Sequence, residues 1–207
     1  GSVNLFLSDL PYGLFSDGRC PGLPNDSKID LKRLEACLDY LLAPTGQAVM
    51  FCDFDLLVRI RAEFGKRISF KHYHVLSKTM AMPGNKFYPL NDCEFLAVCH
   101  RTGARISDLT FNPYNGNQGE AYKKKNYNLD ECKIRRQLKP KFNHNETGRR
   151  FIRTIIPMQS KCNLPASERA GISHPFQKPV KVLRQLIRVY SNPGDFILDS
   201  FAGSGST

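Results

Sequence analysis

The chain has 207 residues, 41% hydrophobic and 24% charged, which is the composition of a globular domain large enough to bury a core. No apolar run approaches the roughly 20 residues of a membrane helix, and seven scattered cysteines without a CxxC pair argue against a disulfide framework and against a zinc site. The net charge of +11 is concentrated, because residues 101–173 carry 15 basic and 6 acidic residues and so account for +9 of it. This balance predicts a surface for a polyanion in the middle of the chain.

Apolar runs and helical periodicity alternate through the first hundred residues. We expect strands at 3–8, 47–52, 68–76 and 94–99, and helices at 29–42 and 53–64. Residues rich in Gly, Pro and Asn predict loops at 14–28 and 83–92, and a turn at 44–46 that ends the first helix. This alternation of strand and helix predicts an α/β domain with a mainly parallel sheet.

The first strand leads into Asp9-Leu10-Pro11-Tyr12. Proline biases the residue before it to an extended conformation, so the Leu10 carbonyl can point outward beside the Asp9 carboxylate. Two neighbouring acceptors suit an exocyclic amino group on a planar base, and Tyr12 can stack on that base. A strand followed by an ordinary tight turn is the alternative for this tetrapeptide.

The periodicity fades after Gly103. Residues 104–171 mix basic residues with Asn, Gly, Pro and isolated aromatics, so we expect an insertion with little core of its own. Its clustered basic residues are candidates for contacts with a polyanion, the alternative being a solvated loop face: Lys123, Lys124, Lys125, Arg135, Arg136, Arg149 and Arg150. If that polyanion is a nucleic acid, the side chains with amides that can read base edges are Asn112, Asn115, Asn117 and Gln118.

Order returns after His174. We expect a helix over residues 180–190, a turn at 191–194 and a strand at 195–198 that runs into Phe201-Ala202-Gly203-Ser204-Gly205. A strand that ends in such a turn lets backbone N–H groups approach a ligand closely. A turn of small residues without a ligand is the alternative.

Three segments occur together in a characteristic order: DLPYG, then HPFQKPVKVLRQLIRVYSNPGD, then FILDSFAGSGST. They closely resemble the β class of S-adenosylmethionine-dependent DNA amino-methyltransferases, which act on adenine N6 or cytosine N4 and have a circularly permuted motif order. The resemblance covers roughly residues 3–100 and 172–207. It implies a Rossmann-like methyltransferase fold with a catalytic half at 3–103, a basic target-recognition insertion at 104–171 and a cofactor-binding half at 172–207.

The resemblance also assigns roles to matching positions. It places Asp9 and the Leu10 carbonyl on the target amino group, with Pro11 and Tyr12 completing the catalytic motif. It implies S-adenosyl-L-methionine as cofactor and no metal. The residues it places at the cofactor are Asp9, Gln177, Lys178, Asp199, Phe201, Ala202, Gly203, Ser204, Gly205, Ser206 and Thr207.

Two departures from the family pattern stand out. The family usually has proline where this chain has Leu10, which predicts a less rigid turn around an intact carbonyl acceptor. Cofactor-binding α/β folds also carry an acidic residue about 20 positions beyond the glycine turn, where it binds ribose hydroxyls. These 207 residues do not include that position, so we expect the natural protein to extend further.

The resemblance implies transfer of a methyl group to the exocyclic amine of a flipped base, and an Asp before the Pro-Tyr pair favours adenine N6. The alternatives are a cytosine N4 enzyme and a catalytically inactive DNA-binding subunit of the same fold. A nicotinamide dehydrogenase is disfavoured, because the GxGxxG pattern is incomplete. DNA is the partner implied, and a homodimer and a cognate restriction nuclease are further expectations. The expected setting is the cytoplasm of a bacterial host, at the nucleoid, with no membrane involved.

Overall fold

A computed structural model describes residues 1–11, 29–82, 86–87, 89–115, 117–118, 122–123, 144–145, 147–159, 177–203 and 205. The strands of its central sheet are β1 (Val3–Asp9), β2 (Leu42–Cys52), β3 (Ile68–Met82), β4 (Asn91–Arg101), β9 (Ile155–Met158) and β10 (Ile197–Leu198). The helices are α1 (Leu31–Leu41), α2 (Phe54–Glu63) and α4 (Val180–Tyr190), with 3-10 turns η1 (Ile106–Asp108) and η2 (Pro113–Asn115). Two small strand pairs complete the list: β5 (Asn117–Gln118) with β8 (Arg149–Arg150), and β6 (Tyr122–Lys123) with β7 (His144–Asn145).

The central sheet has six strands in the order β10-β1-β2-β4-β3-β9. β1 runs parallel to both of its neighbours, β10 and β2, and β9 runs parallel to β3. β4 runs antiparallel to β2 and to β3. The α/β class is therefore confirmed, and the sheet is mixed, because β4 reverses the direction that its neighbours share.

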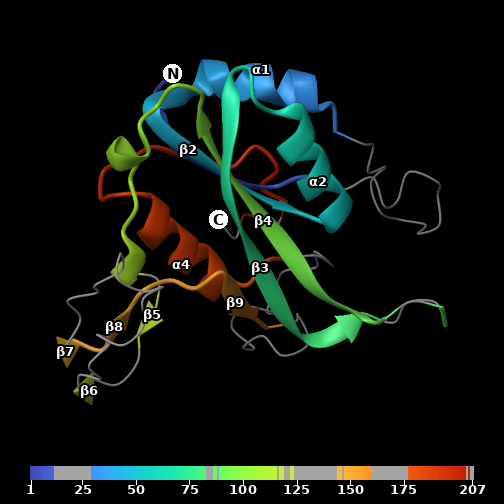
Figure 1. Ribbon diagram of the computed structural model, residues 1–207, viewed down its shortest axis with the longest axis vertical. Helices are drawn as coiled ribbons and strands as arrows, with labels where there is room; N and C mark the ends of the chain where they lie inside the picture. Colours follow the sequence, from blue (N-terminus) through green and yellow to red (C-terminus); the bar gives the residue numbers. More distant parts are fainter. Residues whose placement is uncertain are drawn as a thin grey trace, which may run out of the picture.

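Helices cover both faces of this sheet, with α1 and α2 on one side and α4 on the other (Figure 1). Even-numbered Phe6 of β1 packs with α1 and α2, whereas Leu5 and Leu7 pack with α4. Successive side chains of a strand point to opposite faces, so a strand covered on both faces needs the continuous apolar run that β1 has. β1 thus lies at the centre of a three-layer α/β/α core.

The first two helices begin at aspartates that satisfy their free backbone N–H groups. Asp30 accepts hydrogen bonds from the amides of Lys32 and Arg33 at 3.0 and 3.2 Å, and Asp53 accepts one from the Leu56 amide at 2.8 Å. α4 instead has Pro179 at its N-cap position, and the Pro179 carbonyl accepts a hydrogen bond from the Val182 amide at 3.0 Å. These caps fix where each helix leaves the sheet.

Several predicted boundaries were wrong. β2 starts at Leu42, directly after α1, and includes residues 44–46, which we expected to form a turn. The pairing of β1 with β2 shifts register between Val3 and Leu5, so the extra residues of β2 are absorbed there as a bulge. β3 and β4 are longer than expected, and only Ile197–Leu198 of the last predicted strand pairs in the sheet.

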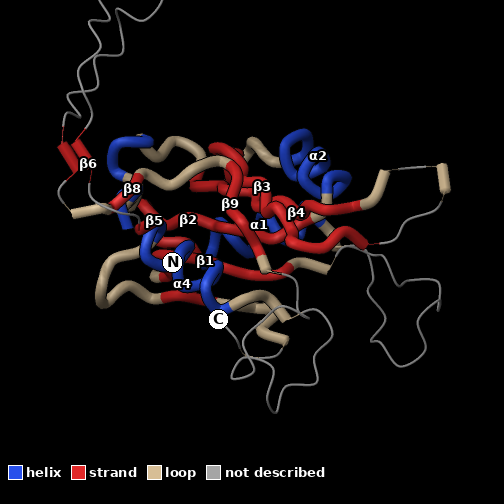
Figure 2. The backbone as a smooth tube through the Cα atoms, turned by 90° about the horizontal axis from the view of Figure 1, so that it is seen from below, coloured by secondary structure: helices blue, strands red, loops and turns tan. Residues whose placement is uncertain are grey.

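Part of the predicted insertion belongs to the central sheet. β9 lies within residues 104–171 and pairs with β3, with Ile156 and Met158 buried in the same core as α4. The small strand pairs lie to one side of the sheet, on the side away from α2 (Figures 1 and 2). The segment therefore leaves the core, forms these small pairs and returns to the core at β9.

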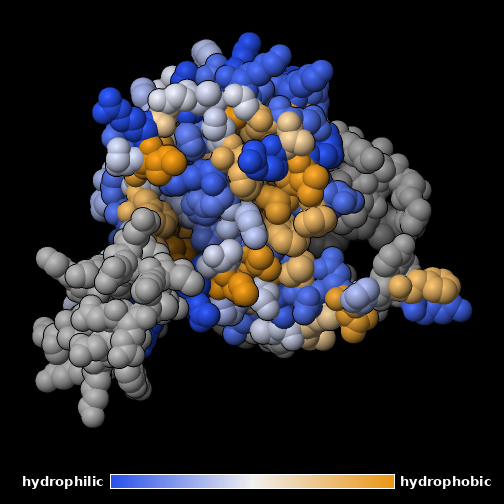
Figure 3. Space-filling view, in the orientation of Figure 1, coloured by the Kyte–Doolittle hydropathy of each residue, from blue (hydrophilic) through white to orange (hydrophobic). Residues whose placement is uncertain are grey.

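The surface over α1 is hydrophilic, and hydrophobic residues gather beside α2 on the same view of the molecule (Figure 3). Phe54 and Val58 are exposed apolar side chains of α2. None of the helices in the described part of the chain is long and apolar enough to cross a membrane.

Candidate active site

The structure brings the two ends of the chain together at one edge of the sheet. β1 and β10 are neighbouring parallel strands, in which Leu5 pairs with Ile197 and Phe6 with Leu198. Parallel strands have their carboxyl ends at the same edge, which is where open α/β sheets bind ligands. Asp9, at the end of β1, and the glycine turn after β10 therefore occupy adjacent strand tips.

A hydrogen-bonded junction ties these two tips to each other. The Ser8 hydroxyl donates to Oδ1 of Asp199 at 2.6 Å, and the Phe201 amide lies 3.1 Å from both the Ser8 oxygen and the same carboxylate oxygen. The resemblance placed Asp199 at the cofactor, and the sequence analysis did not single out Ser8.

The turn after β10 depends on glycine. Gly203 and Gly205 have φ values of 53° and 70°, which L side chains rarely adopt, and the Gly205 amide donates to the Ala202 carbonyl at 2.7 Å. A Cβ built on Gly205 meets no atom within 4 Å, so this side of the turn faces open space. Phe201 is 41% exposed at the start of the turn. Ser204, Ser206 and Thr207 lie outside the described residues.

Asp9 is also the first of four charged side chains that alternate in sign. The other three are Lys178, Glu94 and Lys78. The Lys178 ammonium lies 3.2 Å from Oδ2 of Asp9 and 2.9 Å from Oε2 of Glu94, and the Lys78 ammonium lies 3.0 Å from Oε1 of Glu94. The Lys178 ammonium also lies 5.2 Å from the centre of the Phe51 ring, a cation–π distance. The sequence did not predict Glu94 or Lys78 as site residues.

Strand alternation explains why these groups meet. Leu7, Leu96 and Leu76 belong to the core beneath α4, and residues two positions along each strand face the same side. Asp9 on β1, Glu94 on β4 and Lys78 on β3 therefore all face the layer of α4. Lys178, which comes directly before α4, closes over them.

The charges in this cluster hold one another in the ionised state. Burial by itself lowers the pKa of Lys178, but Asp9 and Glu94 outweigh it and raise that pKa above its ordinary value. Burial likewise raises the pKa of Glu94, and Lys178 and Lys78 outweigh it and lower that pKa. The cluster is thus a set of coupled ion pairs.

The remaining residues of the predicted catalytic tetrapeptide are described in part. The Leu10 side chain is 2% exposed and packs in the core beneath α1 and α2. Burial of this side chain anchors the turn at the position where the family usually has proline. Pro11 is half-buried, and Tyr12 lies outside the described residues.

The predicted DNA-binding residues are placed only in part. Arg149 and Arg150 form β8 and are exposed, and the backbone of Lys123 belongs to β6. Lys124, Lys125, Arg135 and Arg136 lie outside the described residues.

The amides of Asn112 and Asn115, expected to read bases, instead contact the end of α4. Asn112 donates to the Ser191 carbonyl at 3.0 Å and Asn115 to the Arg188 carbonyl at 3.4 Å. The last carbonyls of a helix have no partner within that helix, so these two amides serve the structure. The side chains of Asn117 and Gln118 are not among those described.

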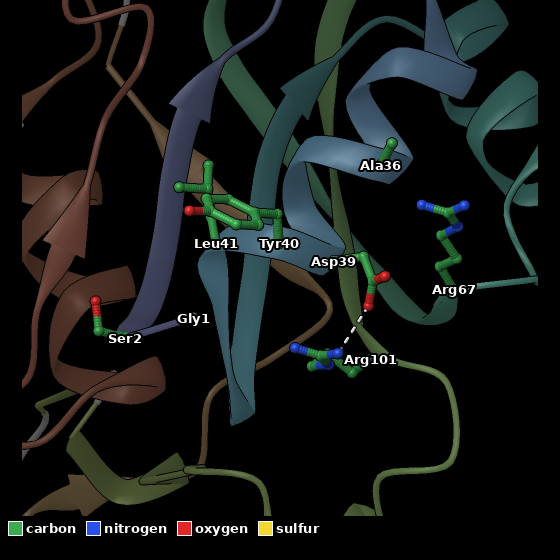
Figure 4. Close-up of a pocket in the computed structure, with 8 residues that line it drawn as sticks. All are labelled: Gly1, Ser2, Ala36, Asp39, Tyr40, Leu41, Arg67 and Arg101. Atoms are coloured by element: carbon green, nitrogen blue, oxygen red, sulfur yellow. Dashed lines mark ion pairs between the residues drawn. The ribbon is translucent and has the colours of Figure 1, made fainter.

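Gln177, predicted to contact the cofactor, is 7% exposed directly before Lys178. Among the described residues, no cluster of His, Cys, Asp or Glu could hold a metal ion. A hollow of about 560 Å³ lies between the amino terminus, α1 and Arg67, where Asp39 and Arg101 form an ion pair of 2.8 Å (Figure 4). It adjoins Gly1 and Ser2, before the start of β1, whereas Asp9 ends that strand, so the hollow lies apart from the site.

Comparison with known proteins shows the family and the fold of this chain. The family of DNA methylases of the N6/N4 type matches residues 3–207. A DNA adenine methyltransferase of Escherichia coli (strain K12), YhdJ, is 54% identical over 35 residues, which are 17% of this chain and 12% of that protein.

Solved structures resemble the whole chain. The complex of M1.HpyAVI with SAM has 22% identity and a TM-score of 0.59, over 100% of this chain and 76% of that one. The cytosine-N4-specific PvuII DNA methyltransferase has 15% identity and a TM-score of 0.60, over 100% of this chain and 70% of that one. These likenesses confirm the Rossmann-like methyltransferase fold.

Proposed function

We propose that this chain, which belongs to the N6/N4 DNA methylase family, transfers a methyl group from S-adenosyl-L-methionine to the exocyclic amine of a base flipped out of DNA. The observation that carries the proposal is the junction between the two strand tips. Ser8, next to Asp9, is hydrogen-bonded to Asp199 and to the Phe201 amide. The Asp9 carboxylate, which would accept the amino group, therefore lies beside the glycine turn at the same edge of the sheet.

The residues at this edge fit the cofactor. S-adenosylmethionine supplies an electrophilic methyl group on a positively charged sulfonium. The glycine turn faces open space at Gly205, Phe201 offers a partly exposed ring, and Asp9 offers a negative charge to a cationic ligand. Asp199 holds the backbone of the turn. The predicted set is completed by Gln177, Lys178, Ala202, Gly203, Ser204, Ser206 and Thr207.

Asp9 and the Leu10 carbonyl each accept one N–H of the target amine, which turns the nitrogen lone pair toward the methyl group. That lone pair forms the new N–C bond while the C–S pair stays on sulfur, and the nitrogen loses one of its two protons to the Asp9 carboxylate, which passes it to water. The base must first leave the duplex at a cost of a few kcal/mol, and Tyr12 is proposed to stack on it. Positioning supplies most of the rate.

Adenine N6 is the proposed target. The Asp at position 9 favours it within the family, and the 35-residue match to an adenine methyltransferase supports it. Cytosine N4 is the second candidate, because a neighbour with the same fold has that specificity. DNA is the proposed substrate; a second copy of the chain, a cognate restriction nuclease and a cytoplasmic location stay predictions.

Methylation of random-sequence DNA, followed by digestion and mass spectrometry of the nucleosides, tests the function. We expect N6-methyladenine from the wild type and a loss of at least about a hundredfold in Asp9→Ala, as for removal of a positioned proton-handling group. Asp55→Ala removes an equal charge from the exposed first turn of α2 and should leave the rate unchanged. N4-methylcytosine would assign the second target.

Calorimetry separates the enzyme from an inactive DNA-binding subunit. Binding of S-adenosylmethionine to the full-length protein together with a methylated product supports the proposal. DNA binding without cofactor binding and without product would assign the inactive subunit instead.

A further inference from the structure

We propose that Glu94 is a positioning residue of the methyl transfer, which anchors the Lys178 ammonium so that Asp9 keeps both its orientation and its capacity to accept the target amine. The inference rests on the proposed function of Asp9. No motif of the sequence assigned this role to Glu94, which lies 85 positions from Asp9 along the chain.

The distances place the Lys178 ammonium between the two carboxylates. The ammonium lies 2.9 Å from Glu94 and 3.2 Å from Asp9, over the ring of Phe51. In the sheet, Phe51 pairs with Asp9 on one side and with Leu96, two residues beyond Glu94, on the other. The register of three strands therefore fixes the ammonium between the two carboxylates.

The four side chains of the cluster differ in how far they are exposed to solvent. Lys178, Lys78 and Glu94 are 11%, 13% and 18% exposed, whereas Asp9 is 29% exposed. The most buried charges thus lie behind the carboxylate that faces outward. Charge pairs that are partly removed from water are screened little, so Glu94 acts on Asp9 through Lys178 over a short path.

Two carboxylates face two ammonium groups in this cluster, because Lys78 also pairs with Glu94. Glu94 therefore shares Lys178 with Asp9. If Glu94 were neutral, Asp9 would be the one carboxylate of the cluster left to pair with Lys178. That pair would compete with the target amine for the Asp9 oxygens and would let the ammonium follow Asp9 out of position.

Glu94→Gln tests the inference, because it keeps the shape of the side chain and removes its charge. We expect kcat to fall about tenfold to a hundredfold, the range that follows from misplacing a catalytic group, while KM for DNA and the Kd for S-adenosylmethionine change less than about twofold. Glu94→Asp keeps the charge and should restore part of kcat. Glu63→Gln is the matched control, since Glu63 pairs with Arg59 at 3.1 Å on the exposed side of α2.

A titration of the unliganded protein gives a readout that does not depend on activity. In Glu94→Gln one of the two carboxylates that raise the pKa of Lys178 is gone, while the burial that lowers it stays. NMR of the Lys178 side chain should therefore show deprotonation at a lower pH than in the wild type, and the alkaline limb of kcat should move in the same direction. Glu63→Gln should shift neither.

The outcomes separate the two proposals. A wild type that methylates no base refutes the proposed function. A wild type that methylates DNA while Glu94→Gln keeps its kcat and its Lys178 titration refutes the role of Glu94. Equal losses of unfolding temperature, cofactor binding and kcat in Glu94→Gln and Glu94→Asp would make Glu94 a purely structural residue and would also overturn the inference.

Discussion

Gly205 and Gly103 have the same kind of backbone strain in different places. Their φ values are 70° and 87°, and a Cβ built on either residue meets no atom within 4 Å. An alanine at such a φ costs roughly 1–2 kcal/mol, because its Cβ approaches the following carbonyl. Gly205 lies in the turn after β10, whereas Gly103 follows β4 at the opposite end of the sheet.

We predict that Gly205→Ala and Gly103→Ala lower the free energy of unfolding by similar amounts, but that only Gly205→Ala weakens cofactor binding, by tenfold or more. The added methyl group would occupy the open side of the turn. Urea unfolding measures the first effect and calorimetry with S-adenosylmethionine the second. Equal cofactor affinities in the two variants would contradict a role of this turn in binding.

At the level of residues, local sequence patterns found only part of the site. Asp9, Lys178 and Asp199 belong to short motifs, and the structure places all three at the same edge of the sheet. Glu94 and Ser8 could not be found in this way, because their partners are 84 and 191 positions away and are reached only through strand register. Pairing across a sheet leaves no local pattern in the sequence.

Among the elements, β3 and α4 are joined by a hydrogen-bonded relay with a defined direction. Nδ1 of His74 lies 3.1 Å from the Arg153 carbonyl, which can only accept, so this nitrogen carries the proton. Nε2 of His74 then accepts from the Tyr190 hydroxyl at 2.6 Å, and the Tyr190 oxygen accepts from Nε2 of His72 at 2.8 Å. The relay needs a neutral His74 imidazole, because its Nε2 accepts a hydrogen bond. It connects Arg153, just before β9, to Tyr190 at the end of α4.

The burial of these two histidines predicts a dependence of stability on pH. Burial lowers the pKa of His72 from 6.5 to about 4, with His74 and Lys71 adding to the effect, and burial lowers the pKa of His74 as well. Between pH 6.5 and about pH 4, His72 binds more protons in the unfolded chain than in the folded one. The contribution of His72 is therefore complete above pH 6.5 and is lost as the pH falls toward 4.

We expect the wild type to lose about 2 kcal/mol more than His72→Gln between pH 7 and pH 4.5 in urea unfolding, from about 1.4 kcal/mol per pH unit of displacement. Carboxylates titrate in both proteins and cancel in the comparison. Parallel pH profiles of the two proteins would show that His72 does not titrate in this range.

Helices and strands could be predicted where their buried apolar side chains recur at regular spacing in the sequence. α4 was predicted with both ends correct, because its apolar side chains recur at helical spacing and pack against β1. The outer parts of β3 and β4 were missed, since pairs such as Ser77 with Cys93 supply backbone hydrogen bonds without burying apolar side chains. β9 was missed because Pro157 argues against a strand, and it is tolerated there because β9 is an edge strand.

For the whole molecule, the positive charge is concentrated in one segment of the chain. Residues 101–173 carry +9 of the net +11, and their exposed arginines at β8 lie on the side of the sheet away from α2 (Figure 1). A protein that neutralises phosphates with Lys and Arg releases counterions, so log K falls linearly with log salt concentration, with a slope of about −0.9 per phosphate contacted. The slope therefore counts the contacts that a variant has lost.

We predict that the double variant Arg149→Ala/Arg150→Ala reduces the magnitude of this slope by about two and weakens binding to all DNA sequences alike. The matched control is Arg59→Ala/Arg61→Ala, which removes the same charge from α2 and should leave the slope unchanged. Fluorescence anisotropy between 50 and 200 mM salt, roughly the range over which such contacts are resolved, measures both slopes. If the two double variants changed the slope equally, net charge would attract DNA to the whole surface, and the segment around β8 would have no special part in binding.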